Sequence, residues 1–426
     1  MASPTPSQPE TISIAPLLTR LAYPGTAGQD VGACEIAGAF ALIFENRLSV
    51  TQMAAFLTLL HSTGKDRDPD VIVLCAERMR DAAEQVDKEE LKRVLSKRCR
   101  KEGTYEGGFC DIVGTGGDSH KTFNISTTSS IIASPLLLMA KHGNRAQTSF
   151  SGSADVLTSI VPKPPVLETV TAKALPKVYE TSNYAFLFAP NFHSGMRFAA
   201  PVRKSLGLRT IFNLLGPLAN PIEWGIEARV VGVAYQSLGP IFAEVLRKQG
   251  CKKGIVVCGA EDLDEISCAG ITNCWMLKEE DNAAFNPSEE ECPIDNPRRI
   301  INIESFSVQP SDFGLSTHPL SEVGGGKMPQ ENARLLMSIL KNELPPDHPI
   351  LEFVLVNVGA LIAVSGICEA ETSDMGPGDT GKVITERGPG GVRWKEGVRR
   401  ARWAIESGEA VKSLENFIEA SNMLLM

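Results

Sequence analysis

The sequence predicts an α/β protein with a small N-terminal helical domain and a larger domain built on a mixed, mainly parallel sheet. From Ile12 to about Arg100, apolar residues recur at helical spacing and no strand pattern intervenes. From Phe109 onward, glycine-bounded β-rich segments alternate with helices, which is typical of parallel strands covered by helices. We therefore expect a tail over residues 1–10, a helical domain over residues 11–104 and an α/β domain over residues 105–426.

The individual elements follow from local patterns. Apolar periodicity predicts helices in the first domain over Ala33–Glu45, Ser49–Ser62, Pro69–Val86 and Lys88–Arg100. In the second domain we expect strands over Cys110–Val113, Ala185–Phe188, Glu227–Val233, Gly254–Val257 and Arg299–Ser305, with helices over Ser126–Ala140, Leu238–Gln249 and Gln330–Lys341. Residues 1–10, rich in Pro, Ser and Thr, predict a mobile tail, and the acidic stretch Glu279–Pro297 predicts an exposed excursion.

Composition is that of a soluble globular protein, with 43% hydrophobic and 22% charged residues among 426. No apolar run is long enough to span a bilayer and the N-terminus lacks a signal-peptide core, so we expect a cytoplasmic protein. Ten scattered cysteines without a C-x-x-C pair favour reduced core residues over disulfides or zinc ligands. A net charge of −9 argues against a nucleic-acid or anionic-membrane partner. An anionic substrate would then need a locally basic site, which Lys121, Lys141, Arg145 and Arg203 could provide.

Residues 111–127, DIVGTGGDSHKTFNIST, have the composition of a site for a phosphorylated ligand. The three glycines within Gly114–Gly117 follow a predicted buried strand, and they let backbone N–H groups close around phosphate oxygens. Asn124–Thr127 falls at the start of the next predicted helix, where unpaired N–H groups favour an anion. A plain tight turn is the alternative. The loop matches neither the dinucleotide-binding nor the P-loop fingerprint, so those two functions lose their usual support.

A second polar segment, Ala140–Ser153, follows the apolar run and is expected to form a loop. Its two cations, its amide and its hydroxyls lie beside glycines and suit pyrophosphate and sugar oxygens. A solvated basic turn is the alternative. For His142, a hydrogen-bonded structural role is favoured over a catalytic one.

Two adjacent acids, Asp264 and Glu265, follow the predicted strand Gly254–Val257 and its loop. Adjacent carboxylates that point in different directions can hold an oxygen-seeking cation such as Mg²⁺, although acid pairs in turns are usually only solvated. A pyrophosphate ligand changes this balance, because a polyanion normally travels with Mg²⁺ and nearby carboxylates would otherwise repel it.

Six motifs follow one another along the chain: GTGGD at 114–118, NIST at 124–127, KHGNR at 141–145, SGSAD at 151–155, PVRKSLGLRTIFNLLGPLANP at 201–221 and LDEIS at 263–267. This ordered set resembles the anthranilate phosphoribosyltransferase family of the tryptophan pathway. GGGKMPQENA at 324–333 and EGVRRARWAIESGEA at 396–410 are similar to the family's C-terminal region. The match spans about residues 12–425. One string alone would be weak, whereas the ordered set is highly specific.

The resemblance implies a fold of the nucleoside phosphorylase/phosphoribosyltransferase type, a helical domain completed by residues around 195–220, and a homodimer formed through that domain. It implies that the sugar diphosphate is bound by Gly114, Gly117, Asp118, Thr122, Asn124, Ile125, Ser126, Thr127, Lys141, His142, Gly143, Asn144, Arg145, Ser149 and Ser153. It further implies that anthranilate is bound by Gly114, Asn144 and Arg203, and Mg²⁺ by Ser126, Asp264 and Glu265.

The residues alone leave one of these assignments open. An aromatic carboxylate is best held by a planar guanidinium, and Arg203 and Arg209 both lie in the segment 201–221. Spacing does not separate the two, and surface ion pairing is the alternative for either. Only the resemblance assigns the anthranilate carboxylate to Arg203.

The expected reaction transfers the phosphoribosyl group of 5-phosphoribosyl 1-diphosphate to the amine of anthranilate and releases pyrophosphate. This displacement at the anomeric carbon needs no covalent nucleophile from the protein. It needs positive charge at the leaving group and two substrates held so that their encounter is effectively intramolecular. A nucleoside phosphorylase of the same fold is one alternative, but a different lysine- and serine-rich phosphate signature would be expected of it. A catalytically silent binding protein is the other, and it would bind ligand without turnover.

Overall fold

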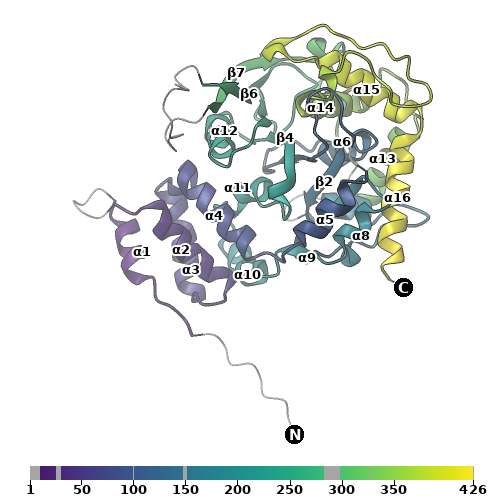
Figure 1. Ribbon diagram of the computed structural model, residues 1–426. Helices are drawn as coiled ribbons and strands as arrows, with labels where there is room; N and C mark the ends of the chain where they lie inside the picture. The colour runs from purple at the N-terminus through teal and green to yellow at the C-terminus, as the bar shows by residue number, and fades with distance from the viewer. Residues whose placement is uncertain are drawn as a thin grey trace. The chain divides into compact units, whose positions relative to one another are not determined.

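The computed structural model describes residues 10–24, 30–98, 100–146, 151–282, 298–326 and 328–425 (Figure 1). The chain divides into two compact units. The first comprises Met1–Gln85 and Ala189–Pro221, and the second comprises Val86–Phe188 and Ile222–Met426. A helical unit and an α/β unit with a mixed sheet confirm the predicted fold class.

The described residues of the first unit form only helices: α1 (Ala15–Ala22), α2 (Ala33–Phe44), α3 (Val50–Ser62), α4 (Pro69–Asp81), α9 (Ala189–Phe192), α10 (Met196–Leu206) and α11 (Phe212–Leu215), with short 3₁₀ turns. Local signals start these helices, since the Ser49 side chain accepts the Gln52 N–H and the Asp68 side chain accepts the Asp70 N–H. Figure 1 shows α10 and α11 beside helices far earlier in the chain, against which they pack. The ring of Phe212 lies 4.9 Å from that of Phe40, so the returning segment shares one core with the N-terminal helices.

The boundary between the units lies near residue 85 and not near residue 104. Helix α5 (Lys88–Leu95) belongs to the second unit, because its apolar face packs on α8 (Leu175–Tyr179). Helical periodicity shows that a segment has an apolar face, but it does not show which core that face joins.

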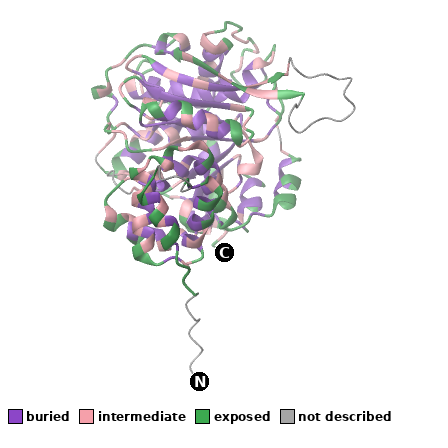
Figure 2. Ribbon diagram, turned by 90° about the vertical axis from the view of Figure 1, so that its left-hand side faces the viewer, coloured by how far each residue is buried: buried purple, intermediate pink, exposed green. Residues whose placement is uncertain are grey.

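The second unit contains a seven-stranded sheet in the order β3-β2-β1-β4-β5-β6-β7. The strands are β1 (Phe109–Gly114), β2 (Leu138–Gly143), β3 (Tyr184–Phe188), β4 (Ile226–Gly232), β5 (Lys253–Gly259), β6 (Thr272–Asp281) and β7 (Arg299–Val308). Strands β1 to β5 pair in parallel, and β6 and β7 pair antiparallel. The inner strands β1, β2 and β5 are mostly buried, and purple prevails in the sheet in Figure 2.

Helices cover this sheet: α6 (Ile125–Ala133), α7 (Ser153–Leu157), α12 (Gly239–Lys248), α13 (Pro329–Leu340), α14 (Pro349–Ser365), α15 (Trp394–Glu406) and α16 (Glu409–Met423). Helix α14 is buried at every residue from Ile350 to Ser365 and packs on α6, α15 and three strands. A helix that is apolar on all sides belongs inside a core. Within the described ranges, no helix is both long and apolar enough to cross a membrane.

Several elements of this unit differ from those expected from the sequence. Ser126–Ala140 is not one helix, because α6 ends at Ala133, just before Pro135, and the chain then enters β2. Proline has no N–H for the next helical hydrogen bond. Strand β6 is absent from the expected set, and its charged end falls in the stretch interpreted as an excursion. Residues 283–297 of that stretch, like residues 1–9 of the tail, lie outside the described residues.

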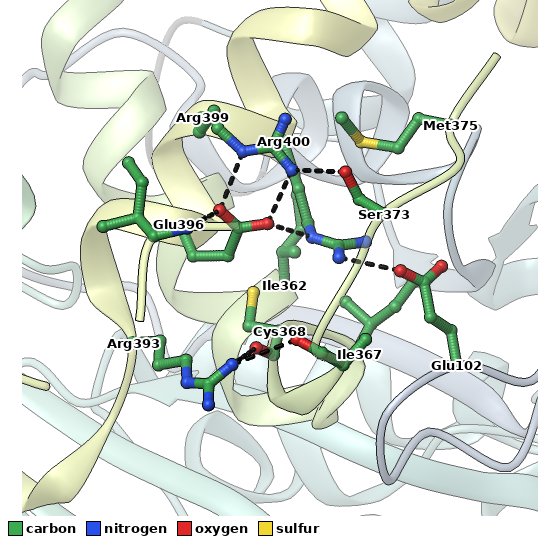
Figure 3. Close-up of polar contacts among 12 residues, drawn as sticks. Glu102, Ile362, Ile367, Cys368, Ser373, Met375, Arg393, Glu396, Arg399 and Arg400 are labelled. Carbon is green, nitrogen blue, oxygen red and sulfur yellow. Dashed lines mark hydrogen bonds and ion pairs between the residues drawn. The ribbon is translucent and has the colours of Figure 1, made fainter. Parts of the chain in front are cut away.

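Charged side chains form a buried group between α15 and the chain before β1. We call Glu102, Glu396, Arg399 and Arg400 the arginine cluster (Figure 3). The Glu396 carboxylate accepts hydrogen bonds of 2.7 Å from Arg399 and from Arg400, and Arg400 also forms an ion pair of 2.7 Å with Glu102. The side chains of Glu396 and Arg400 are completely buried. Acids and guanidinium groups therefore neutralise each other within this cluster.

Candidate active site

The glycine loop begins where β1 ends. Gly116 and Gly117 have φ values of +63° and +86°, which L side chains rarely adopt. The Gly116 N–H donates a hydrogen bond of 2.6 Å to Oδ2 of Asp264. A Cβ at Gly114 would lie 2.3 Å from the same oxygen, so this position has no room for a side chain. The loop and the acid pair, 148 residues apart in sequence, are thus in direct contact.

The acid pair lies in a turn after β5, and we call residues 263–267 the acid turn. The backbone carbonyl of Asp264 presses on the end of β4, where a Cβ at Gly232 would come within 1.6 Å of it. Asp118 accepts the Asp264 N–H at 3.5 Å, and the Thr122 hydroxyl donates to Glu265 at 3.5 Å. Because β1, β4 and β5 are parallel, their carboxyl ends meet at one edge of the sheet and collect these groups.

Negative charge accumulates at this edge. Burial and the charges of Asp264 and Asp118 raise the pKa of Glu265 well above its ordinary value. Lys141, only 2% exposed, faces the same acids: burial lowers its pKa, and the charges of Asp111, Glu265 and Asp264 oppose that shift. Asp111, a buried residue of β1, is a member of this group that sequence reasoning missed. An acid within a buried strand beside the glycine loop was the available signal.

These carboxylates fit Mg²⁺ by their chemistry. Burying acids side by side is unfavourable unless a cation offsets their charge. In the described residues, no three His, Cys, Asp or Glu side chains are already arranged as a metal site. That is compatible with Mg²⁺, which usually takes one or two carboxylates and completes its shell with water and substrate phosphate oxygens.

The start of α6 holds the NIST residues. The Asn124 side chain accepts the Thr127 N–H at 3.2 Å and so caps the helix, and its amide nitrogen approaches the Ser153 hydroxyl at 3.5 Å. Ile125 and Thr127 are buried, so they can offer a ligand little beyond their backbone. Ser126 is half-buried and remains the accessible hydroxyl at this helix start.

The second polar segment is not one loop. Lys141, His142 and Gly143 lie in β2, His142 is only 6% exposed, and the loop begins at Asn144. Lys141 is therefore buried within the sheet, whereas Arg145 lies in the loop that follows β2. Ser149 lies outside the described residues.

Arg145 is held at the start of this loop by two acids. Its guanidinium pairs with Asp155 and with Glu168, both at 3.3 Å. Asp155 also accepts the N–H groups of Ala146 and Gly152 at 2.8 and 3.0 Å, which ties the two ends of the loop together. Asp155 is the last residue of SGSAD, and the sequence analysis did not assign it this role.

Arg203 and Arg209 lie in the first unit, in different local settings. Arg203 is in the last turn of α10 with its guanidinium 5.1 Å from the centre of the Phe212 ring, and burial lowers its pKa. Gly207 ends the helix with a φ of +64°, and Arg209 follows in the connection to α11. Arg203 is therefore braced by an aromatic side chain.

Comparisons with known proteins agree with this arrangement. Residues 106–411 match the glycosyl transferase family a/b domain, and residues 20–83 match its helical bundle domain. The anthranilate phosphoribosyltransferase of Schizosaccharomyces pombe is 38% identical over 376 residues, 88% of each chain, and that of Saccharomyces cerevisiae is 32% identical over 383 residues, covering 88% of this chain and 87% of the yeast protein.

Solved structures are also similar. The Saccharomyces cerevisiae anthranilate phosphoribosyltransferase in complex with PRPP and Mg has a TM-score of 0.74 at 28% identity, and covers 96% of this chain and 99% of its own. The Thermus thermophilus enzyme has a TM-score of 0.70 at 28% identity, with 95% and 99% covered. The chain therefore belongs to the anthranilate phosphoribosyltransferase family.

Proposed function

We infer that this protein transfers the phosphoribosyl group of 5-phosphoribosyl 1-diphosphate to the amine of anthranilate in tryptophan biosynthesis, with Mg²⁺ as cofactor. The observation that carries this function is the hydrogen bond between Gly116 and Asp264, which joins the glycine loop to the acid turn. Family membership and the yeast structure in complex with PRPP and Mg support the same reaction.

Different residues have different roles in this displacement. We propose that the glycine loop, the start of α6 and the β2 end with its following loop bind the sugar diphosphate, using the residues that the resemblance implies. Asp264, Glu265 and Ser126 would hold Mg²⁺, which would supply positive charge beside the leaving diphosphate. Lys141 adds a buried cation on the same edge of the sheet. No side chain has to form a covalent bond, since holding both substrates in line and stabilising the charge on the leaving group both lower the barrier.

One assay tests the function directly. Anthranilate is fluorescent, and its fluorescence should fall when the purified protein receives the sugar diphosphate and Mg²⁺, with pyrophosphate formed in equal amount. Omission of Mg²⁺ should stop the reaction. Binding of both substrates without loss of fluorescence would contradict the proposed function and support a silent binding protein.

Arg203 is our candidate for the anthranilate carboxylate. Arg203→Ala should raise the KM for anthranilate by about tenfold to 150-fold, because a charge-assisted bidentate contact contributes about 1.5–3 kcal/mol. The KM for the sugar diphosphate should change far less, and Arg203→Lys should rescue only in part. Arg209→Ala is the matched control. A selective anthranilate defect in Arg209→Ala alone would move the assignment to Arg209.

We also propose a cytoplasmic homodimer. Ile12, Tyr23 and Val50 of the first unit expose 37%, 67% and 68% of their surface, which favours burial against a second copy. Sedimentation should give a dimer, and a fully active monomer at micromolar concentration would contradict this proposal.

A further inference from the structure

Asn357 is a polar residue where an apolar one would be expected. It lies in the middle of α14, is 1% exposed, and has buried residues on every side of the helix. Burying an amide is unfavourable unless hydrogen bonds replace those it made with water. The partners of Asn357 therefore show what this amide contributes.

The side-chain amide of Asn357 forms three hydrogen bonds. Its oxygen accepts the Ile266 N–H at 3.0 Å, and its nitrogen donates to the Ile266 carbonyl at 3.0 Å and to the Phe353 carbonyl at 3.1 Å. One side chain thus holds both polar groups of a single residue, as a neighbouring strand would. Ile266 immediately follows Glu265, so these hydrogen bonds attach the acid turn to α14 at the residue next to the two acids.

The other side of the acid turn contacts the glycine loop and the end of β4. Gly116 donates to the Asp264 carboxylate at 2.6 Å, and Gly232 leaves room for the Asp264 carbonyl. Asn357 completes this support from the side of α14. Groups that orient a metal ligand without touching the metal commonly change metal affinity when they are removed.

We infer that Asn357 is a positioning residue that directs the Asp264 and Glu265 carboxylates toward Mg²⁺ and the diphosphate. This inference rests on the proposed function, because it presumes that these acids hold the metal. Asn357 itself touches neither substrate nor metal. Its replacement should loosen the acid turn and raise the Mg²⁺ requirement, with little effect on anthranilate.

Three variants test this inference: Asn357→Leu, Asn357→Ala and the control Ser365→Ala. Leucine removes the bonds to Ile266 at similar size, whereas alanine removes the same bonds without adding bulk, and neither introduces a charge beside the acid turn. Ser365 is buried on the same helix, and its hydroxyl bonds the backbone of Ile362 and Ile367, away from the acid turn. Folding of each variant is checked by thermal unfolding.

The first measurement is hydrogen–deuterium exchange of the metal-free protein over residues 263–268. Exchange should be faster in Asn357→Leu and in Asn357→Ala and unchanged in Ser365→Ala. In the assay, the Mg²⁺ concentration at half-maximal rate should rise about tenfold for Asn357→Leu, with the KM for anthranilate within about twofold of wild type.

Wild-type exchange and a wild-type Mg²⁺ requirement in the Asn357 variants would overturn the inference. If leucine prevents folding, alanine decides in the same two measurements. The variant Asp264→Asn distinguishes failure of this inference from failure of the proposed metal site. A wild-type Mg²⁺ requirement in Asp264→Asn would show that the acids do not bind the metal. The exchange rates of the Asn357 variants would still show whether Asn357 holds the acid turn.

Discussion

The arginine cluster and the acid turn both bring carboxylates out of bulk water, but they balance the charge in opposite ways. Burial alone would raise the pKa of Glu396, yet hydrogen bonds from Arg399, from the Ile384 N–H and from Arg400 lower it. In the acid turn, burial and two neighbouring negative charges raise the pKa of Glu265. In the first cluster each acid is paired with a guanidinium group. Around the acid turn, Asp264, Glu265 and Asp118 lie together, and the buried cation Lys141 opposes their charge only in part. Buried charge that is internally paired indicates a structural role, and like charges held together indicate a binding site.

The largest expected effect is on stability, in the arginine cluster. Glu396→Gln should lower the free energy of unfolding by about 3–5 kcal/mol, because Arg399 and the buried guanidinium of Arg400 both lose a charged partner and Arg400 keeps only Glu102. Urea unfolding measures this loss, and kcat/KM of the folded protein should stay near wild type. Glu386→Gln is the matched control, since it removes an exposed partner of Lys395 and should cost at most about 1 kcal/mol. Equal costs in the two variants would contradict the comparison.

The acid turn should show the reverse behaviour. Asp264→Asn and Glu265→Gln should each reduce kcat/KM by about 10²–10³-fold, roughly 3–4 kcal/mol of transition-state stabilisation. Thermal unfolding should be unchanged or shifted upward, because each substitution removes one of several like charges. If either variant unfolds more easily but keeps its activity, the acid turn has a structural role like that of the arginine cluster.

A buried histidine in the first unit extends the comparison to a titratable group that avoids buried charge by staying neutral. His193 is 4% exposed and its Nε2 lies 2.9 Å from the Ala219 carbonyl; burial lowers its pKa to about 4. The unfolded chain, with a pKa near 6.5, binds the proton first, so stability present above about pH 6.5 is lost as the pH falls toward 4. The loss should reach about 3 kcal/mol at most.

Urea unfolding between pH 7 and 4.5 measures this effect. His193→Gln keeps a donor near the Ala219 carbonyl but cannot be protonated, so its stability should change less over this range. If wild type and His193→Gln lose stability in parallel, other groups cause the acid sensitivity.

The sequence indicated where the glycine loop and the acid pair lie relative to the strands, because these motifs are local. GTGGD needs backbone without side chains, and Gly114, Gly116 and Gly117 show that need in the structure. Whether Asp264 and Glu265 hold Mg²⁺ and Arg203 holds anthranilate stays a prediction. The assignment of Lys141 and His142 to a loop was wrong, because β2 follows so closely on α6 that one apolar run covers both.

By itself, the sequence determined the fold class, the strand-to-loop position of the glycines in GTGGD and the adjacency of the two acids, since each depends on neighbouring residues. Only the tertiary structure decided that α5 joins the second unit, that Asp111 and Lys141 share the edge occupied by the acid turn, and that Asn357 holds Ile266. These contacts join residues far apart in the chain. Packing selects them through burial and through the need to pair every buried polar group, and one helix or strand pattern carries no information about its partner.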